Sequence, residues 1–180
     1  MSRKTTISTI TAAVVTAGVF VSLTLSSVAQ TKQSSISDSD KQFITEAAQD
    51  GKLEVELGQL AQQRAASSDV KQFAQRMIRD HSQGNNQLKR LAAQKNVTIP
   101  SDLDVQFKAV RDMLSNLSGK NFDQTYMKYM VEDHEGDVSF RFPMEAQHGE
   151  DRDVKAWAAQ ILPTLREHLQ MARSIANKPG

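Results

Sequence analysis

The sequence contains no cysteine. This absence excludes disulfide bonds, thiolate metal ligands, a cysteine nucleophile and a lipid-modified N-terminal cysteine, so the fold must be held by packing alone. Neither sign of charge dominates, because 22 Lys and Arg residues are nearly balanced by 21 Asp and Glu residues. No basic tract and no basic patch with interleaved aromatic residues occurs. We therefore expect no nucleic-acid partner.

Sequence motifs of the common catalytic machineries are also missing. The chain has no Ser/His/Asp nucleophile arrangement, no phosphate-binding loop and no HExxH metalloprotease pattern. Hydrolytic chemistry thus has no support, and we expect a binding or structural role rather than an enzyme. Protein partners are not indicated, and a homo-oligomer stays open.

One long apolar run is present, and it lies at the N-terminus. Arg3 and Lys4 precede the mostly apolar residues 7–25, and the small-x-small sequence SVA follows at 27–29. This order is typical of a signal peptide that ends at a signal-peptidase site. An uncleaved anchor is the competing interpretation, but interspersed Thr and Ser make this stretch a weak membrane span. We predict cleavage after residue 29, export to a bacterial periplasm and no stable membrane span afterwards.

The remaining 151 residues suffice for one domain with a core. Residues 30–39 are rich in Ser, Gln and Thr and are predicted to form a disordered tether. Apolar residues then recur at helical spacing in four long stretches, which predicts helices at about 40–66, 69–95, 122–148 and 151–176. A shorter amphipathic helix is predicted at 103–117, and residues 177–180 form a tail. Pro143 should kink the third long helix or break one of its backbone bonds.

Connection lengths predict how these helices are arranged. The first and last pairs of long helices are joined by tight turns, whereas about 26 residues separate the second long helix from the third. That connection can cross the full length of a bundle, which makes the second and third long helices parallel. The predicted fold is all-α: a ferritin-like four-helix bundle over residues 40–176, with a long crossover that contains the short helix.

Ligand-type side chains occur on the predicted inner face of each long helix. Glu54 and His81 lie equally far from the turn that joins their helices, so they should be level. Asp133 and His168 should lie near the same mid-height. The predicted stripe of this helix contains Tyr126, Met130, Asp133, Phe140 and Met144. His134 is about 100° around the helix from Asp133. Tyr126 and Met130 favour Asp133 inward, although a modest rotation would bring in His134.

Two interpretations of these residues remain open. They can bind one metal ion such as zinc, iron or copper, since imidazole and carboxylate groups suit these metals. Alternatively, they form a buried hydrogen-bonded network, in which a Glu54–His81 pair would explain both residues. Asp50 and Asp137, one helical turn from Glu54 and Asp133, are interpreted as solvated residues near helix edges.

Several separated motifs together resemble a known family of exported bacterial proteins, the domain of unknown function 4142. The matching segments are 54–58 (EVELG), 76–81 (RMIRDH), 118–119 (SG) with 122–123 (FD), 133–134 (DH) and 162–168 (LPTLREH). The resemblance covers about residues 41–176 and implies a ferritin-like four-helix bundle and an exported location, without an established reaction.

One departure from ferritins concerns the spacing of the ligands. Di-iron bundles use Glu-x-x-His, which puts both side chains on one helix face. Here the residues three positions before His81, His134 and His168 are Ile78, Val131 and Leu165. The spacing therefore favours a mononuclear site, with Glu54, His81, Asp133, His134 and His168 as the candidate ligands.

Overall fold

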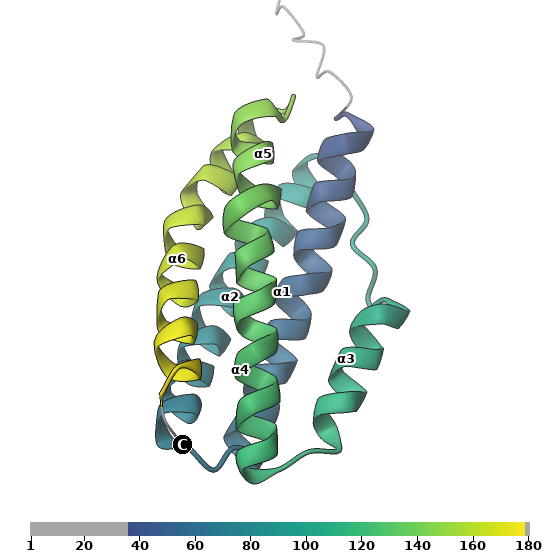
Figure 1. The fold of residues 1–180 in the computed structure, drawn as a ribbon. Helices are drawn as coiled ribbons and strands as arrows, with labels where there is room; N and C mark the ends of the chain where they lie inside the picture. Colours follow the sequence, from purple (N-terminus) through teal and green to yellow (C-terminus); the bar gives the residue numbers. More distant parts are fainter. Residues whose placement is uncertain (1–35, 179–180) are drawn as a thin grey trace, which may run out of the picture. The chain divides into compact units, whose positions relative to one another are not determined.

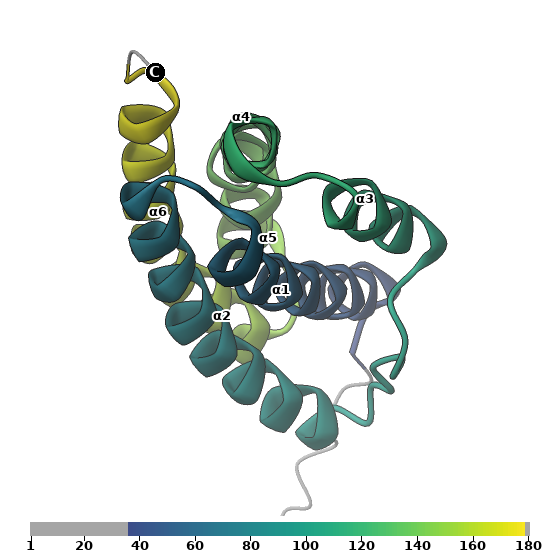
Figure 2. The ribbon, with the colours of Figure 1, turned by 90° about the horizontal axis from the view of Figure 1, so that it is seen from below.

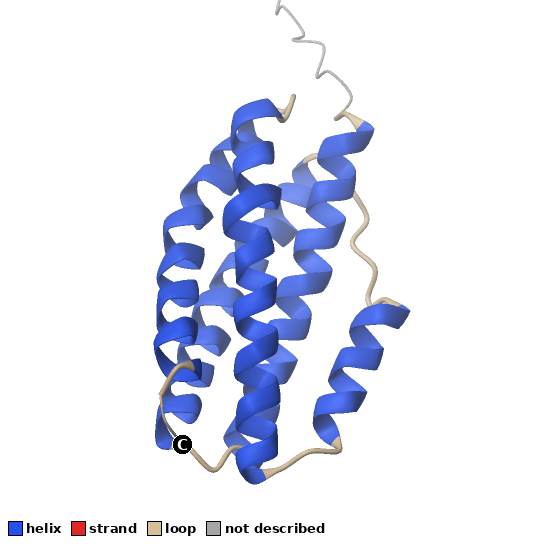
Figure 3. Ribbon diagram, in the orientation of Figure 1, coloured by secondary structure: helices blue, strands red, loops and turns tan. Residues whose placement is uncertain are grey.

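The computed structural model describes residues 36–178. The predicted signal peptide and residues 30–35 of the predicted tether lie outside these residues, so cleavage and export stay predictions. Every regular element within the described part is a helix, as Figure 3 shows, and the all-α prediction is confirmed. No helix between residues 36 and 178 combines the length and the apolar character needed to span a bilayer.

Four long helical stretches form the bundle (Figure 1). They are α1 (Asp38–Arg64), α2 (Ser68–Gln94), α6 (Arg152–Ala176), and a composite of α4 (Gly119–Gly136), the π-helical turn η1 (Asp137–Arg141) and α5 (Phe142–His148). The short helix α3 (Val105–Ser115) lies in the crossover. These bounds fall within a few residues of the predicted ones.

The predicted tether ends earlier than expected. Ser37 caps α1, because its side-chain oxygen accepts a hydrogen bond from the backbone N–H of Asp40 at 3.1 Å. Ile36, just before this cap, is buried in the apolar cluster that includes Phe43 and Trp157. Residues 36–39 thus belong to the folded bundle.

The topology follows the predicted one. In Figure 1, α1 descends, α2 ascends, the crossover returns to the lower end, α4 and α5 ascend, and α6 descends. The second and third long stretches are therefore parallel. Viewed from below, α3 lies outside the bundle beside α1 and α4 (Figure 2).

Two apolar clusters fill the bundle and flank a polar layer. The lower cluster includes Leu57, Phe73 and Tyr126, and the upper one includes Phe43 and Trp157. Near the level where the two clusters meet, α1 buries Asp50 and Glu54, the third stretch buries His134 and Asp137, and α6 buries His168. A buried polar group is costly unless it is paired, so this layer either satisfies itself or holds a ligand.

The π-helical turn corrects the predicted inner face of the third long helix. A π turn accommodates one extra residue, which rotates everything after it by about 100° relative to a continuous α-helix. Phe142 is accordingly buried, whereas Phe140 and Met144 are 69% and 45% exposed. The irregularity expected at Pro143 takes this form, because the proline, which has no N–H to donate, lies just after the π turn.

Candidate metal centre

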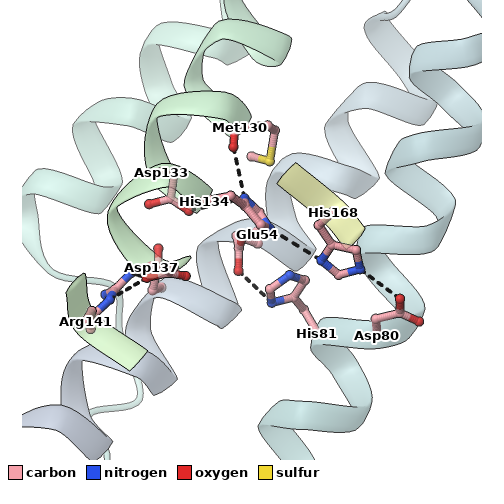
Figure 4. A network of polar contacts seen from close by, with 10 residues as sticks. Glu54, Asp80, His81, Met130, Asp133, His134, Asp137, Arg141 and His168 are labelled. Atoms are coloured by element: carbon pink, nitrogen blue, oxygen red, sulfur yellow. Dashed lines mark hydrogen bonds and ion pairs between the residues drawn. The ribbon is translucent and has the colours of Figure 1, made fainter. Parts of the chain in front are cut away.

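One ligand-type side chain from each long helical stretch converges on the polar layer (Figure 4). Glu54 comes from α1, His81 from α2, His134 from α4 and His168 from α6. Glu54, His134 and His168 have no more than 1% of their side-chain surface exposed, and His81 has 10%. Each of the three imidazoles offers a nitrogen within 4.8 Å of the others.

Each histidine is anchored through one ring nitrogen. Nδ1 of His134 lies 3.0 Å from the carbonyl oxygen of Met130. Because a carbonyl only accepts, this nitrogen carries the proton and the lone pair of the neutral ring lies on Nε2. Nε2 of His168 lies 2.8 Å from a carboxylate oxygen of Asp80, which fixes the other tautomer in the same way.

The Asp80 carboxylate is suited to this anchoring role. Burial raises the pKa of Asp80, but hydrogen bonds from His168 and Arg76 outweigh that effect, so the pKa is lowered overall. Nε of Arg76 lies 3.1 Å from the same carboxylate. An ionised acceptor behind a ligating imidazole sets its tautomer and raises its basicity.

The remaining nitrogens of His134 and His168 face each other. Nε2 of His134 and Nδ1 of His168 are 3.4 Å apart. Both positions carry a lone pair in the tautomers that the anchors select. A proton could bridge them only if one ring were charged, and burial opposes this by lowering the pKa of His168 to about 4 and that of His134 well below its ordinary value.

His81 and Glu54 form the third part of the centre. Nδ1 of His81 lies 2.6 Å from Oε2 of Glu54, so one proton serves this contact. Burial, with Asp50 as the next cause, raises the pKa of Glu54 well above its ordinary value, and burial lowers the pKa of His81 to about 4. When the proton sits on His81 Nδ1, its Nε2, which has no hydrogen-bond partner in the protein, also presents a lone pair.

A carboxylate cluster adjoins the three imidazoles. Arg141 bonds the carboxylates of Asp50 and Asp137, with its Nε 2.6 Å from Asp137 Oδ1. Burial, followed by the proximity of Asp50, raises the pKa of Asp137 to about 7. Asp50 and Asp137 are 3% and 2% exposed, so their interpretation as solvated edge residues was wrong.

The structure brings together Glu54, His81, His134 and His168 from the predicted set, and on α4 it is His134, not the favoured Asp133, that joins the other two histidines. Asp133 lies beside the carboxylates, where Asp50, Asp133 and Asp137 each offer an oxygen within 4.8 Å of the others. Within residues 36–178, a third such group combines Glu54, Asp133 and His134. Metal binding by any of these groups stays a prediction.

Sequence reasoning missed two residues that organise the centre. Asp80 directly precedes His81 and was not among the candidate residues, yet its carboxylate reaches His168 on α6. Arg141 lies four residues after Asp137, a spacing that favours an ion pair on a helix. That i,i+4 spacing was the available signal for Arg141.

Comparisons with known proteins identify the family and support the fold. The chain belongs to the family described as Domain of unknown function (DUF4142), whose sequence profile matches residues 25–175. It is similar to a DUF305 fragment from Deinococcus radiodurans, with a TM-score of 0.67, 16% identity and coverage of 78% of this chain and 97% of that one. It is also similar to CopM in the Cu(I)-bound form, with a TM-score of 0.62, 18% identity and coverage of 75% and 93%. No curated protein matched the sequence.

Proposed function

We propose that this chain is an exported metal-binding protein that holds one ion among His81, His134 and His168. The observation that carries the proposal is the convergence of imidazole lone pairs in a buried layer. Nε2 of His134 and Nδ1 of His168 face each other at 3.4 Å, with their outer nitrogens tied to oxygen acceptors. Two lone pairs in this position repel unless a cation lies between them.

The distances suit a first-row transition metal. Metal–nitrogen bonds of about 2.0–2.1 Å place tetrahedral donors roughly 3.3–3.5 Å apart, which matches the 3.4 Å between the rings of His134 and His168. His81 would supply the third donor, because one of its ring nitrogens lies within 4.8 Å of those of His134 and His168. Oε1 of Glu54, 3.4 Å from Nε2 of His134, is the protein's own candidate for a fourth donor.

The donor set narrows the choice of ion. Three imidazoles and one carboxylate favour zinc or copper(II) over iron, since carboxylate-rich sites are more typical of iron. The structurally similar CopM, which has a Cu(I)-bound form, is consistent with a metal on a bundle of this fold. Export to the periplasm is supported by the signal-peptide pattern of residues 1–29. Such a protein would bind metal in an envelope or stress context rather than catalyse a reaction.

The rival proposal is a non-catalytic structural or interaction module. Its specific support is the Glu54–His81 contact and the Arg141 bridge to two buried carboxylates, which pair these side chains without a ligand. Such networks can specify helix register without any ligand.

Equilibrium dialysis of purified protein against zinc and, separately, copper(II) distinguishes the two. We expect about one ion per chain in the wild type and a loss in His134→Ala and His168→Ala. His148→Ala is the matched control, because His148 is the one histidine that lies exposed and outside the centre. Absence of bound metal at every loading, or equal binding in all variants, leaves only the structural module.

A further inference from the structure

A cavity of about 290 Å³ opens beside the histidines, between α1, α2 and α6. His81 and His168 line it, whereas the fully buried His134 does not. The exposed residues Gln83 and Gln160 also line it, so the cavity reaches the protein surface. An ion held by the three histidines would therefore have one side toward this cavity. Its volume is at the lower end of the range for small-molecule pockets.

Buried polar atoms without a hydrogen-bond partner concentrate around this cavity. Of the eight such side-chain atoms in the described part of the chain, five belong to residues that line it. They are Asp50 Oδ1, Glu54 Oε1, His81 Nε2, Gln87 Oε1 and Trp157 Nε1. The proposed ion would take up Glu54 Oε1 and His81 Nε2. Native proteins leave few buried polar groups unpaired, so the other three atoms indicate a polar guest.

The lining also indicates the chemistry of that guest. Asp50 and Gln87 offer unpartnered acceptor oxygens, whereas Trp157 offers one N–H donor. The cavity lining has more carboxylates than cations, and this excess of negative charge disfavours an anionic guest. The carboxylates belong to Asp50, Glu54, Asp80 and Asp137, and the lining cation is Arg76. A fitting molecule is therefore neutral, has one lone pair for a metal ion and donates at least one hydrogen bond.

Gly84 keeps part of this space open. A Cβ atom added to Gly84 would meet only Cδ1 of Ile161, at an ordinary contact distance of 3.8 Å. A larger side chain at this position would extend from α2 toward α6 and into the cavity. The residue thus offers a way to fill the cavity without touching a ligand of the ion.

We propose that this cavity is a binding site for a small neutral nitrogen or oxygen base, which coordinates the bound ion at its cavity-facing position and donates a hydrogen bond to the cavity wall. The inference rests on the metal-binding function proposed above. Binding forms one coordinate bond from the lone pair of the guest to the ion and transfers no electron or proton. With Glu54 Oε1 as the fourth protein donor, the guest is a fifth ligand, so the centre keeps an open position instead of being a closed structural site.

The test uses cobalt(II)-loaded protein at pH 8 and two probes that differ in one hydrogen-bond donor. Imidazole has a lone pair and an N–H group, and 1-methylimidazole has the lone pair alone. We expect imidazole to shift the visible cobalt absorption saturably and to bind at least about tenfold more tightly than 1-methylimidazole, because a buried acceptor loses its partner in the second case. Metal analysis after gel filtration checks that cobalt stays bound.

Gly84→Leu should retain cobalt and lose the spectral response to imidazole. Gly136→Leu is the control, because Gly136 is exposed and an added Cβ meets nothing within 4 Å; this variant should keep the cobalt and the response to imidazole. Equal affinities for the two probes, an absent spectral response, or an unchanged response in Gly84→Leu would overturn the inference and leave the metal-binding proposal standing. A wild-type protein that takes up no cobalt, zinc or copper would overturn both.

Discussion

Arg141 provides a test of how the polar layer is held together. Its guanidinium bonds Asp50 and Asp137, whose side chains are 4% and 2% exposed. Replacing Arg141 with Met keeps an unbranched side chain of similar reach but leaves both carboxylates without their cation. Breaking a buried charge network by removing one partner costs about 3–5 kcal/mol. This is a large fraction of the stability of an ordinary domain.

The cost of Arg141→Met should depend on pH in a defined direction. Burial and the proximity of Asp50 raise the pKa of Asp137 from 3.8 to about 7, so the folded state holds a proton that the unfolded state has released. A raised folded-state pKa makes stability fall as pH rises through this window. Arg141 lowers the pKa of Asp137, so removing Arg141 raises that pKa further, and stability then continues to fall at higher pH. The destabilisation should therefore be greater at pH 8.5 than at pH 5.5, by at least about 1 kcal/mol.

Urea unfolding in the presence of a chelator, at pH 5.5 and pH 8.5, measures this difference without interference from metal. Arg173→Met is the matched control, because Arg173 pairs with Glu135 at the surface, where the two side chains are 54% and 44% exposed. An exposed pair of this kind contributes less than about 1 kcal/mol. Equal losses for Arg141→Met and Arg173→Met, or a loss that does not grow with pH, would refute the account of the buried network.

Three further outcomes are expected. Asp40 accepts hydrogen bonds from the backbone N–H groups of Glu150 and Asp151 at 3.1 and 2.9 Å, so Asp40→Ala should lower the free energy of unfolding by about 1–3 kcal/mol. A decrease below about 0.5 kcal/mol in denaturant unfolding would count against this role. Asp80→Asn should weaken metal affinity about tenfold or more, measured by competition with a chelator, because it removes the negative charge that raises the basicity of His168. An unchanged affinity would contradict that role. Burial lowers the pKa values of His81 and His168 from 6.5 to about 4, so protons should compete with metal only as pH falls toward 4. Loss of bound metal in dialysis with a midpoint near pH 6.5 would contradict the buried site.

The helical repeat in the sequence predicts most of the bundle. Stripes on α1, α2 and α6 give the correct inner faces, because each of these helices keeps α-helical phase along its length. Their phase, together with the positions of the turns, brings Glu54, His81 and His168 to one height. The long crossover predicts the parallel arrangement of α2 and α4 from chain length alone.

The fourth helical stretch shows where this reasoning fails. Asp133 was favoured by its place on a stripe with Tyr126 and Met130, and the same stripe was continued through Phe140 and Met144 in α-helical phase. The π turn at Asp137–Arg141 changes that phase, so the two downstream residues report on a different face from the upstream ones. His134 is in phase with Met130 and Asp137, and all three are buried. A π turn is set by tertiary packing, which the repeat of one sequence does not reveal.

The burial of Asp50 and Asp137 has the same origin. Carboxylates near a helix edge are normally solvated, and no pattern on α1 or α4 alone predicts otherwise. The cation that makes their burial tolerable, Arg141, is the last residue of the π turn. Its position beside Asp50 depends on how that turn packs against α1.

Anomalous diffraction at the absorption edge of zinc or copper, from crystals of metal-loaded protein, tests the central claim most directly. We expect one strong peak in the core, about 2.0–2.1 Å from a ring nitrogen of each of His81, His134 and His168. A peak among Asp50, Asp133 and Asp137, a peak only at the surface, or no peak at all in fully loaded crystals would contradict the three-histidine centre.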